Sequence, residues 1–192
     1  MADFKTVFQK VMGFEGLYSH DPADYGGETY RGISRRFHPS WDGWDLIDSA
    51  KRMPGFPDSL RTNVHLANLV VAFYKAEFWD KFAGDDIPDQ LVATELFDQI
   101  INMSPGRVIE HLQRAINVLN RNQALYPDIV VDGVFGRKTL AALVECLKHR
   151  GGKLVANLLN IQQGAYYIRR MEEDPTQERF VGWYERIEIV KG

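Results

Sequence analysis

Apolar residues near the start of the chain recur at the three- and four-residue spacing of an amphipathic helix. The pattern predicts a helix from Asp3 to Gly16 whose apolar face consists of Phe4, Val7, Phe8 and Val11. Glu15 lies four residues beyond Val11 and falls on the same face. Burial there would raise the pKa of its carboxyl and suit it to donate a proton. A buried glutamate paired with an arginine has the same pattern, which leaves that alternative open.

Turn-forming residues replace the helical pattern between Leu17 and Ser34. The segment contains Pro22, Gly26, Gly27 and Gly32 among polar residues, and we expect a short strand at Thr29, Tyr30 and Ile33. This predicts a small β-hairpin directly after the first helix.

Helical periodicity returns after a proline-rich and tryptophan-rich stretch, residues 37–57, that predicts irregular structure or short helices. The next pattern predicts one long helix from Ser59 or Leu60 to Phe82. Glu77 falls on its apolar face, four residues after Phe73, and is therefore a rival to Glu15. Because no glycine-rich turn follows Glu77, we expect it to pair with a basic residue and serve a structural role.

A further helix is expected to begin at Asp85 or Asp86, next to Pro88, and to continue to Met103. It is apolar on most sides, and its polar exceptions share one strip of surface: Glu95, Asp98 and Asn102. Such a strip is typical of the wall of a wet cleft, although a simple solvent-facing side would have the same pattern.

Ser104-Pro105-Gly106 interrupts the helical pattern and marks the expected boundary between domains at residues 1–104 and 105–192. Beyond it, helical patterns include Ile109 to Leu119, a helix opening after the turn DGVFGR, and a helix from Gly151-Gly152 to about Arg170. The sequence therefore predicts a mainly α fold with one small hairpin, and a helical second half packed on the first.

The composition of the chain limits which kinds of partner and which compartment we expect for the protein. The 192 residues carry a net charge of -3, which gives no overall attraction to nucleic acid, and no apolar run is long enough for membrane insertion. Cys146 is the only cysteine, so an intramolecular disulfide is excluded and a core position is expected. We interpret Arg31, Arg35 and Arg36 as a solvated face. The N-terminal residues lack the apolar core of a signal peptide, so we expect synthesis in the cytoplasm and export to the cell wall or periplasm.

The sequence lacks the motifs of zinc proteases, redox dithiols, dinucleotide sites and Walker loops. His20, Asp21, Asp24 and Glu28 could gather around a divalent cation, but their spacing fits no EF-hand. We therefore expect no metal and no cofactor, and a metal-dependent hydrolase built on Asp21 and Asp24 is the weaker alternative.

Glu15, Asp24 and Thr29 together suit glycosidic bond cleavage. The reaction requires an acid that protonates the leaving oxygen and a carboxylate or positioned water on the other side of the sugar. A buried Glu15 and a more exposed Asp24 could divide these tasks, and Thr29 could hold the water. Aromatic residues such as Tyr18 and Trp79 suit contact with sugar faces.

The stretch EGLYSHDPADYGGETYRGIS resembles the signature of family 108 of the glycoside hydrolases, N-acetylmuramidases that are similar to phage lysozymes. The resemblance implies a lysozyme-like fold, with Glu15 as general acid and Asp24 and Thr29 placing water or stabilising charge. Leu17 stands where the family usually has a second glycine.

The resemblance continues through FWDKFAGDDIPDQLVATELFDQIINMSP, which places Trp79, Asp98 and Asn102 near the cleft, and Tyr18 belongs to the signature itself. From Gly106 onward the chain resembles the family's peptidoglycan-binding-like domain. The implied activity is hydrolysis of the β-1,4 bond between N-acetylmuramic acid and N-acetylglucosamine in peptidoglycan glycan strands. The resemblance to endolysins also suggests a holin-type export partner. A non-catalytic peptidoglycan-binding or secretion-assisting protein with the same fold is the alternative.

Overall fold

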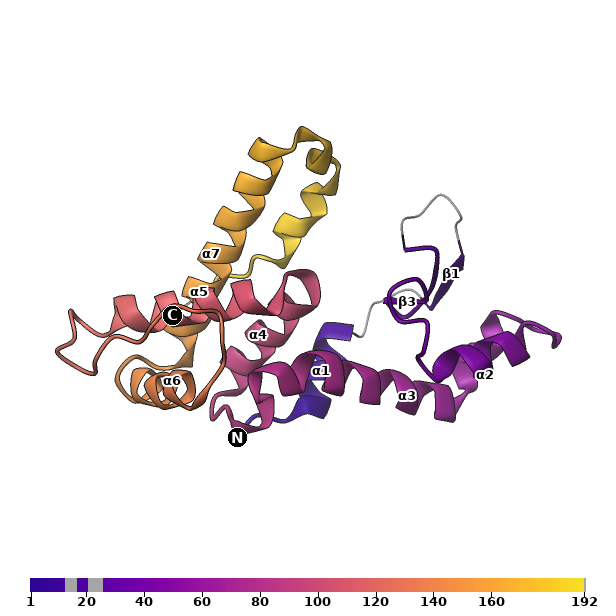
Figure 1. The fold of residues 1–192 in the computed structure, drawn as a ribbon, viewed down its shortest axis with the longest axis horizontal. Helices are drawn as coiled ribbons and strands as arrows, with labels where there is room; N and C mark the ends of the chain where they lie inside the picture. Colours follow the sequence, from indigo (N-terminus) through magenta and orange to yellow (C-terminus); the bar gives the residue numbers. More distant parts are fainter. Residues whose placement is uncertain (13–16, 21–25, 192) are drawn as a thin grey trace. The chain divides into compact units, whose positions relative to one another are not determined.

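The computed structural model describes residues 1–12, 17–20 and 26–191 (Figure 1). The chain divides into two compact units. We call residues 8–77 the sheet unit, and residues 1–7 together with residues 78–192 the helical unit. Among the described residues, no helix combines the length and the apolarity that crossing a bilayer requires.

The first helix, α1 (Phe4–Met12), begins where the Asp3 carboxylate accepts a hydrogen bond from the backbone N–H of Thr6 at 2.8 Å. This contact is typical of an N-cap aspartate and confirms the predicted helix start. In the helical unit, the ring of Phe4 lies 5.3 Å from Trp79 and 5.7 Å from Phe97 between centroids. The predicted helix end at Gly16, like Glu15, lies outside the described residues.

The sheet unit contains a three-stranded antiparallel sheet, β1 (Tyr18–His20), β2 (Glu28–Tyr30) and β3 (Ile33–Ser34), with β2 in the centre. The small hairpin predicted after the first helix is therefore present, extended by a third strand. Arg31 and Gly32 connect β2 to β3 with φ values of 46° and 78°, the signs that a type I′ turn requires. A Cβ on Gly32 would lie 2.6 Å from the hydroxyl of Tyr74, so this position requires glycine.

The rest of the sheet unit is helical. α2 (Gly43–Ala50) packs against α3 (Val64–Tyr74) and against the 3₁₀ helix η1 (Asp58–Thr62). The core of the unit contains Tyr30, Ile33, Trp44, Ile47, Leu60, Leu66, Val70 and Tyr74.

The prediction of one long helix from Ser59 or Leu60 to Phe82 is wrong. Asn63 has an extended ψ of 97°, and its side chain accepts a hydrogen bond from Leu66 N at 3.0 Å, so it ends η1 and caps α3. After α3 the chain forms the π-helical turn η2 (Lys75–Trp79) and the 3₁₀ turn η3 (Asp80–Phe82). Side-chain capping and the wider π turn therefore replace the continuous α-helix.

In the helical unit, a 3₁₀ turn, η4 (Gly84–Asp86), precedes α4 (Gln90–Asn102). The predicted helix start at Asp85 or Asp86 is wrong, because Asp89 is the N-cap and its side chain accepts a hydrogen bond from Val92 N at 3.0 Å. The chain continues through α5 (Pro105–Leu119), α6 (Arg137–Arg150), α7 (Gly152–Glu173) and the 3₁₀ helix η5 (Pro175–Arg186).

α7 is the central element of the helical unit, since α4, α5, α6 and η5 all pack against it (Figure 1). Cys146 of α6 is fully buried, as expected. Both α4 and α5 belong to this unit, so the unit includes both sides of Ser104. The domain boundary that we expected at Ser104-Pro105-Gly106 was inferred from the sequence, and it stays a prediction.

Candidate active site

Of the residues predicted to carry the chemistry, Thr29 and Tyr18 lie in the sheet unit, whereas Trp79, Asp98 and Asn102 lie in the helical unit. Glu15 and Asp24 lie outside the described residues. The described part of the candidate catalytic site is therefore the sheet.

Thr29 occupies the middle of the central strand. Its Cα is paired with Ser19 of β1 and with Ser34 of β3. Directly paired residues project to the same face of an antiparallel sheet, so three hydroxyl side chains share one face. Ser34 is buried and donates to the carbonyl of Gly26 at 2.7 Å, whereas Thr29 is half-buried. A half-buried threonine hydroxyl can hold a water molecule because it both donates and accepts hydrogen bonds.

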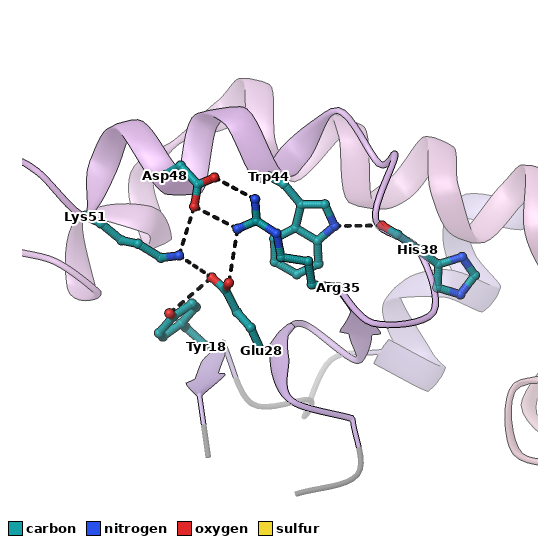
Figure 2. A network of polar contacts seen from close by, with 7 residues as sticks. All are labelled: Tyr18, Glu28, Arg35, His38, Trp44, Asp48 and Lys51. Carbon is teal, nitrogen blue, oxygen red and sulfur yellow. Dashed lines mark hydrogen bonds and ion pairs between the residues drawn. The ribbon is translucent and has the colours of Figure 1, made fainter. Parts of the chain in front are cut away.

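Glu28 (Figure 2) precedes Thr29 in β2 and therefore projects to the opposite face of the sheet. Only 9% of its side chain is exposed. Its carboxylate accepts hydrogen bonds from the Tyr18 hydroxyl at 3.2 Å and from Arg35 Nη1 at 3.1 Å. It also forms an ion pair with Lys51 Nζ at 2.6 Å. Tyr18 thus holds the Glu28 carboxylate, and its ring lies 4.8 Å from that of Phe56.

Arg35 extends these contacts to α2. Its guanidinium binds the Asp48 carboxylate through two hydrogen bonds of 2.8 and 2.7 Å, and it lies over the ring of Trp44 at 5.3 Å. Lys51 Nζ also contacts Asp48, at 2.9 Å. We call Tyr18, Glu28, Arg35, Asp48 and Lys51 the sheet–helix network (Figure 2). Because bidentate arginine–carboxylate pairs are geometrically specific, the network fixes the sheet on α2.

The network controls the charge of its carboxyls. Burial raises the pKa of Glu28, but hydrogen bonds from Lys51 and Arg35 outweigh burial and leave the pKa below its usual value. Hydrogen bonds from Arg35 and then from Lys51 hold the pKa of Asp48 well below its usual range. Both groups are therefore ionised at neutral pH, and neither can act as a general acid there.

Glu28 also belonged to the weaker metal hypothesis, with His20, Asp21 and Asp24. Its carboxylate oxygens contact Lys51, Arg35 and Tyr18 instead of gathering with other acids. No group of three or more potential ligands that could hold a metal is found in the described ranges, which do not include Asp21 and Asp24.

Glu77, the rival carboxylate, is exposed in the π-helical turn η2. The prediction that it lies on an inward apolar face is wrong, because its side chain is exposed to solvent. Together with Trp41, Phe73 and neighbouring residues it lines a surface hollow of about 240 Å³.

Trp79 is completely buried in the core of the helical unit. Its indole N–H donates to the Asp85 carboxylate at 2.8 Å, and its ring packs against Phe4, Phe82 and Phe97. In this position the ring of Trp79 cannot contact a sugar. Trp79 could affect substrate binding only indirectly, by packing in the core of the helical unit.

Asp98 and Asn102 lie on α4, as predicted. Asp98 forms an ion pair with Arg186 of η5 at 3.3 Å, and the exposed Asn102 donates to the backbone carbonyl of Asp98 at 2.7 Å. Glu95, the third member of the polar strip, accepts a hydrogen bond from Gln99 at 2.7 Å. Segment η5 therefore contacts part of the strip that was expected to line a cleft.

Sequence reasoning missed the roles of Arg35, Asp48 and Lys51. Arg35 was interpreted as part of a solvated face, but it is paired with two carboxylates. A local signal existed, because Asp48 and Lys51 are three residues apart on a helical pattern and oppositely charged. Their contact with β2 depends on tertiary packing.

Residues 8–104 match the model of a protein family described as glycosyl hydrolase 108, and this match spans more than half of the chain. The chain belongs to this family. A second model, described as a predicted peptidoglycan domain, matches residues 107–188. A search of curated proteins finds no match. Among solved structures, that of SagA from Brucella abortus is similar, with 26% identity, a TM-score of 0.59, and coverage of 96% of this chain and 88% of that chain.

The fold of this family 108 chain is mainly α and lysozyme-like, with a small antiparallel sheet. The two family matches make it a glycoside hydrolase that acts on peptidoglycan. Among the residues of the first match are Glu15, Asp24 and Thr29.

Proposed function

We propose that this protein hydrolyses the β-1,4 bond between N-acetylmuramic acid and N-acetylglucosamine in peptidoglycan, with Glu15 as the general acid. The observation that carries the proposal is the family 108 match over residues 8–104, a range that includes Glu15, Asp24 and Thr29. Muramidase chemistry requires an acid and a group that places water or stabilises charge, and these residue types supply both.

In the proposed reaction, the Glu15 carboxyl gives its proton to the glycosidic oxygen as the bond from that oxygen to C1 breaks. The sugar then carries oxocarbenium charge at C1. Water adds to C1 and loses a proton to solvent, and Glu15 takes up a proton from solvent before the next turnover. Asp24 and Thr29 would place this water or stabilise the charge.

Two described features support this division of roles. Thr29 lies on the hydroxyl face of the sheet and is half-buried. Arg31 N donates to the carbonyl of Leu17 at 2.9 Å, so the chain two residues after Glu15 is hydrogen-bonded to the end of the strand that carries Thr29. The ion pairs of Glu28 keep its carboxylate ionised, which argues against Glu28 as the proton donor and supports the choice of Glu15.

The decisive experiment incubates purified peptidoglycan with wild type and with Glu15→Gln, with and without a chelator, and counts new reducing ends. We expect the variant to lose about 10²–10⁴-fold in rate, the contribution typical of a general acid. Glu77→Gln is the matched control, because it makes the same chemical change at an exposed glutamate of the sheet unit and should keep wild-type activity.

Asp24→Asn should retain part of the activity if Asp24 only positions water. Release by Glu15→Gln at the wild-type rate would overturn the assignment of the acid. Loss of activity with chelator would favour the metal-dependent alternative. No release by wild type would favour a non-catalytic peptidoglycan-binding or secretion-assisting role.

Because peptidoglycan lies outside the cytoplasmic membrane, we also propose that the enzyme acts at the cell wall or periplasm after export, with a holin-type partner. Co-expression with and without a holin, followed by measurement of lysis, tests this route. Lysis that does not depend on the holin would contradict it.

A further inference from the structure

α5 and α7 pack against each other in the helical unit (Figure 1). A hollow of about 250 Å³ lies on their shared surface. Three arginines line it: Arg107 and Arg114 from α5, and Arg169 from α7. Arg107 and Arg114 are seven residues apart, so they project from the same side of α5. We call this hollow the arginine pocket.

The charge of the arginine pocket is opposite in sign to that of the whole chain. The chain has a net charge of -3, whereas the pocket combines three arginines with one acid, Glu110. Concentrated like charges repel one another and generate a positive potential that attracts anions. The pocket is therefore a suitable site for an anionic group.

The protein supplies only part of the counter-charge to these three arginines. In the part of the chain that the structure describes, neither Arg107 nor Arg114 forms an ion pair, and Arg169 reaches the exposed Glu173 only at 4.0 Å. The Arg107 guanidinium lies over the ring of Tyr166 at 4.8 Å. Stacking of this kind uses the face of the guanidinium and leaves its N–H groups available in the plane, where they match the two oxygens of a carboxylate.

His111 adds a buried polar side chain to the lining of the arginine pocket. His111 is only 8% exposed, and within the described residues its Nδ1 has no hydrogen-bond partner. A buried polar atom without a partner destabilises a protein. Burial, followed by the charges of Arg107, Arg114 and Arg169, lowers the pKa of His111 to about 4, so its ring is neutral at neutral pH.

We propose that the arginine pocket binds a carboxylate of the peptide stems of peptidoglycan. The lining residues lie within residues 107–188, which match the predicted peptidoglycan domain. Stem peptides carry free carboxylates beside small aliphatic groups, and Ala165 and Tyr166 provide an apolar wall next to the guanidinium groups. The inference deepens the proposed function, on which it rests for the identity of the polymer, by adding a contact to the peptide as well as to the glycan.

The test measures binding of a free stem tetrapeptide, without sugar, to the full-length protein by calorimetry. Wild type should bind it, and the same peptide with amidated carboxyls should bind at least about tenfold more weakly, the loss expected for a charge-assisted hydrogen bond. Arg114→Gln should weaken binding by a similar factor, and so should Arg169→Gln. Arg137→Gln, an exposed arginine at the start of α6, is the matched control and should bind like wild type.

Equal binding of the free and amidated peptides, or unchanged binding by both pocket variants, would overturn the proposal. Preferential binding to vesicles containing anionic phospholipid, lost in Arg114→Gln, would also overturn it and assign the pocket to a membrane surface. Because the peptide contains no glycosidic bond, this result is independent of the hydrolysis assay. Failure of the pocket proposal can thus be distinguished from failure of the proposed reaction.

Discussion

Arginine has two different environments in this protein. In the sheet unit, Arg35 binds Asp48 through two hydrogen bonds and Glu28 through a third, so the protein itself supplies both counter-charges. In the helical unit, Arg107 and Arg114 line a hollow, and within the described residues neither of them forms an ion pair with a carboxylate. The first arrangement joins two elements of the fold. The second arrangement is available to bind the anionic group of a ligand.

The difference shows that the role of an arginine depends on where its counter-charge comes from. An internally paired arginine stabilises the folded chain, and its removal leaves a carboxylate with low exposure and one fewer partner. An arginine in a like-charged group contributes little to folding and gains its interaction on binding. Substitution of Arg35 should therefore lower the stability of the free protein. Substitution of an arginine of the pocket should instead lower its affinity for the ligand.

The largest expected effect on stability follows removal of Arg35. Arg35→Gln removes both bonds to Asp48 and one to Glu28, so we expect a loss of about 2 kcal/mol in the free energy of unfolding, allowing for the partial solvent exposure of the group. Urea denaturation at neutral pH measures it. Arg61→Gln, which removes an exposed ion pair with Asp58 in the same unit, should cost less than about 0.5 kcal/mol. Equal losses in the two variants would contradict the structural role of the network.

Acid should weaken the two regions over different pH ranges. The lowered pKa values of Glu28 and Asp48 mean that the unfolded chain binds protons first as the pH falls. The stability that the network contributes is therefore complete above the ordinary carboxyl pKa values, about 4, and is lost below them. Denaturation curves between pH 5 and pH 3 should show this loss in wild type and a smaller loss in Arg35→Gln. Equal slopes would contradict the linkage.

His111 should respond at higher pH. Its pKa is lowered from 6.5 to about 4 by burial and by Arg107, Arg114 and Arg169, while Glu110 is the acid in the same pocket. The stability that it contributes is present above pH 6.5 and declines as the pH falls toward 4. His111→Gln should remove this decline, as measured by denaturation at pH 7, 6 and 5. A variant that still loses wild-type stability over this range would assign the decline to another group.

The smallest expected effect on stability concerns Arg114. Arg114→Gln should change the free energy of unfolding by less than about 0.5 kcal/mol, because no ion pair is lost and repulsion from the other arginines is relieved. Thermal and urea denaturation without ligand measure this change. A loss as large as that of Arg35→Gln would show that Arg114 serves the fold, and would remove the contrast between the two regions.

Local patterns predicted the parts of the fold that depend on neighbouring residues. The spacing of Phe4 and Val7 predicted the first helix, and the capping contact of Asp3 confirms its start. The glycines around Thr29 predicted a hairpin. These features were readable because helix periodicity, capping and turn conformation act over a few residues.

Apolar periodicity gave a wrong prediction for the segment from Ser59 to Phe82. The pattern between Ser59 and Phe82 is helical throughout, yet Asn63 caps a new helix and a π-helical turn follows α3. Glu77 is exposed in that turn and does not occupy the inward position that made it a rival to Glu15. The apolar spacing continues through both interruptions, so periodicity alone showed neither of them, and the local capping signal of Asn63 was overlooked.

The sequence by itself determined the family signature from Glu15 through Thr29, the helical character of the chain, and the residue types available for glycosidic cleavage. Only the tertiary structure decided which charges meet. It joined Arg35 to Asp48 of α2, and it brought Arg169 of α7 to the pocket of Arg107 and Arg114. Charge pairs between separate elements depend on how those elements pack, and that packing follows from the burial of apolar faces and not from the spacing of the charges.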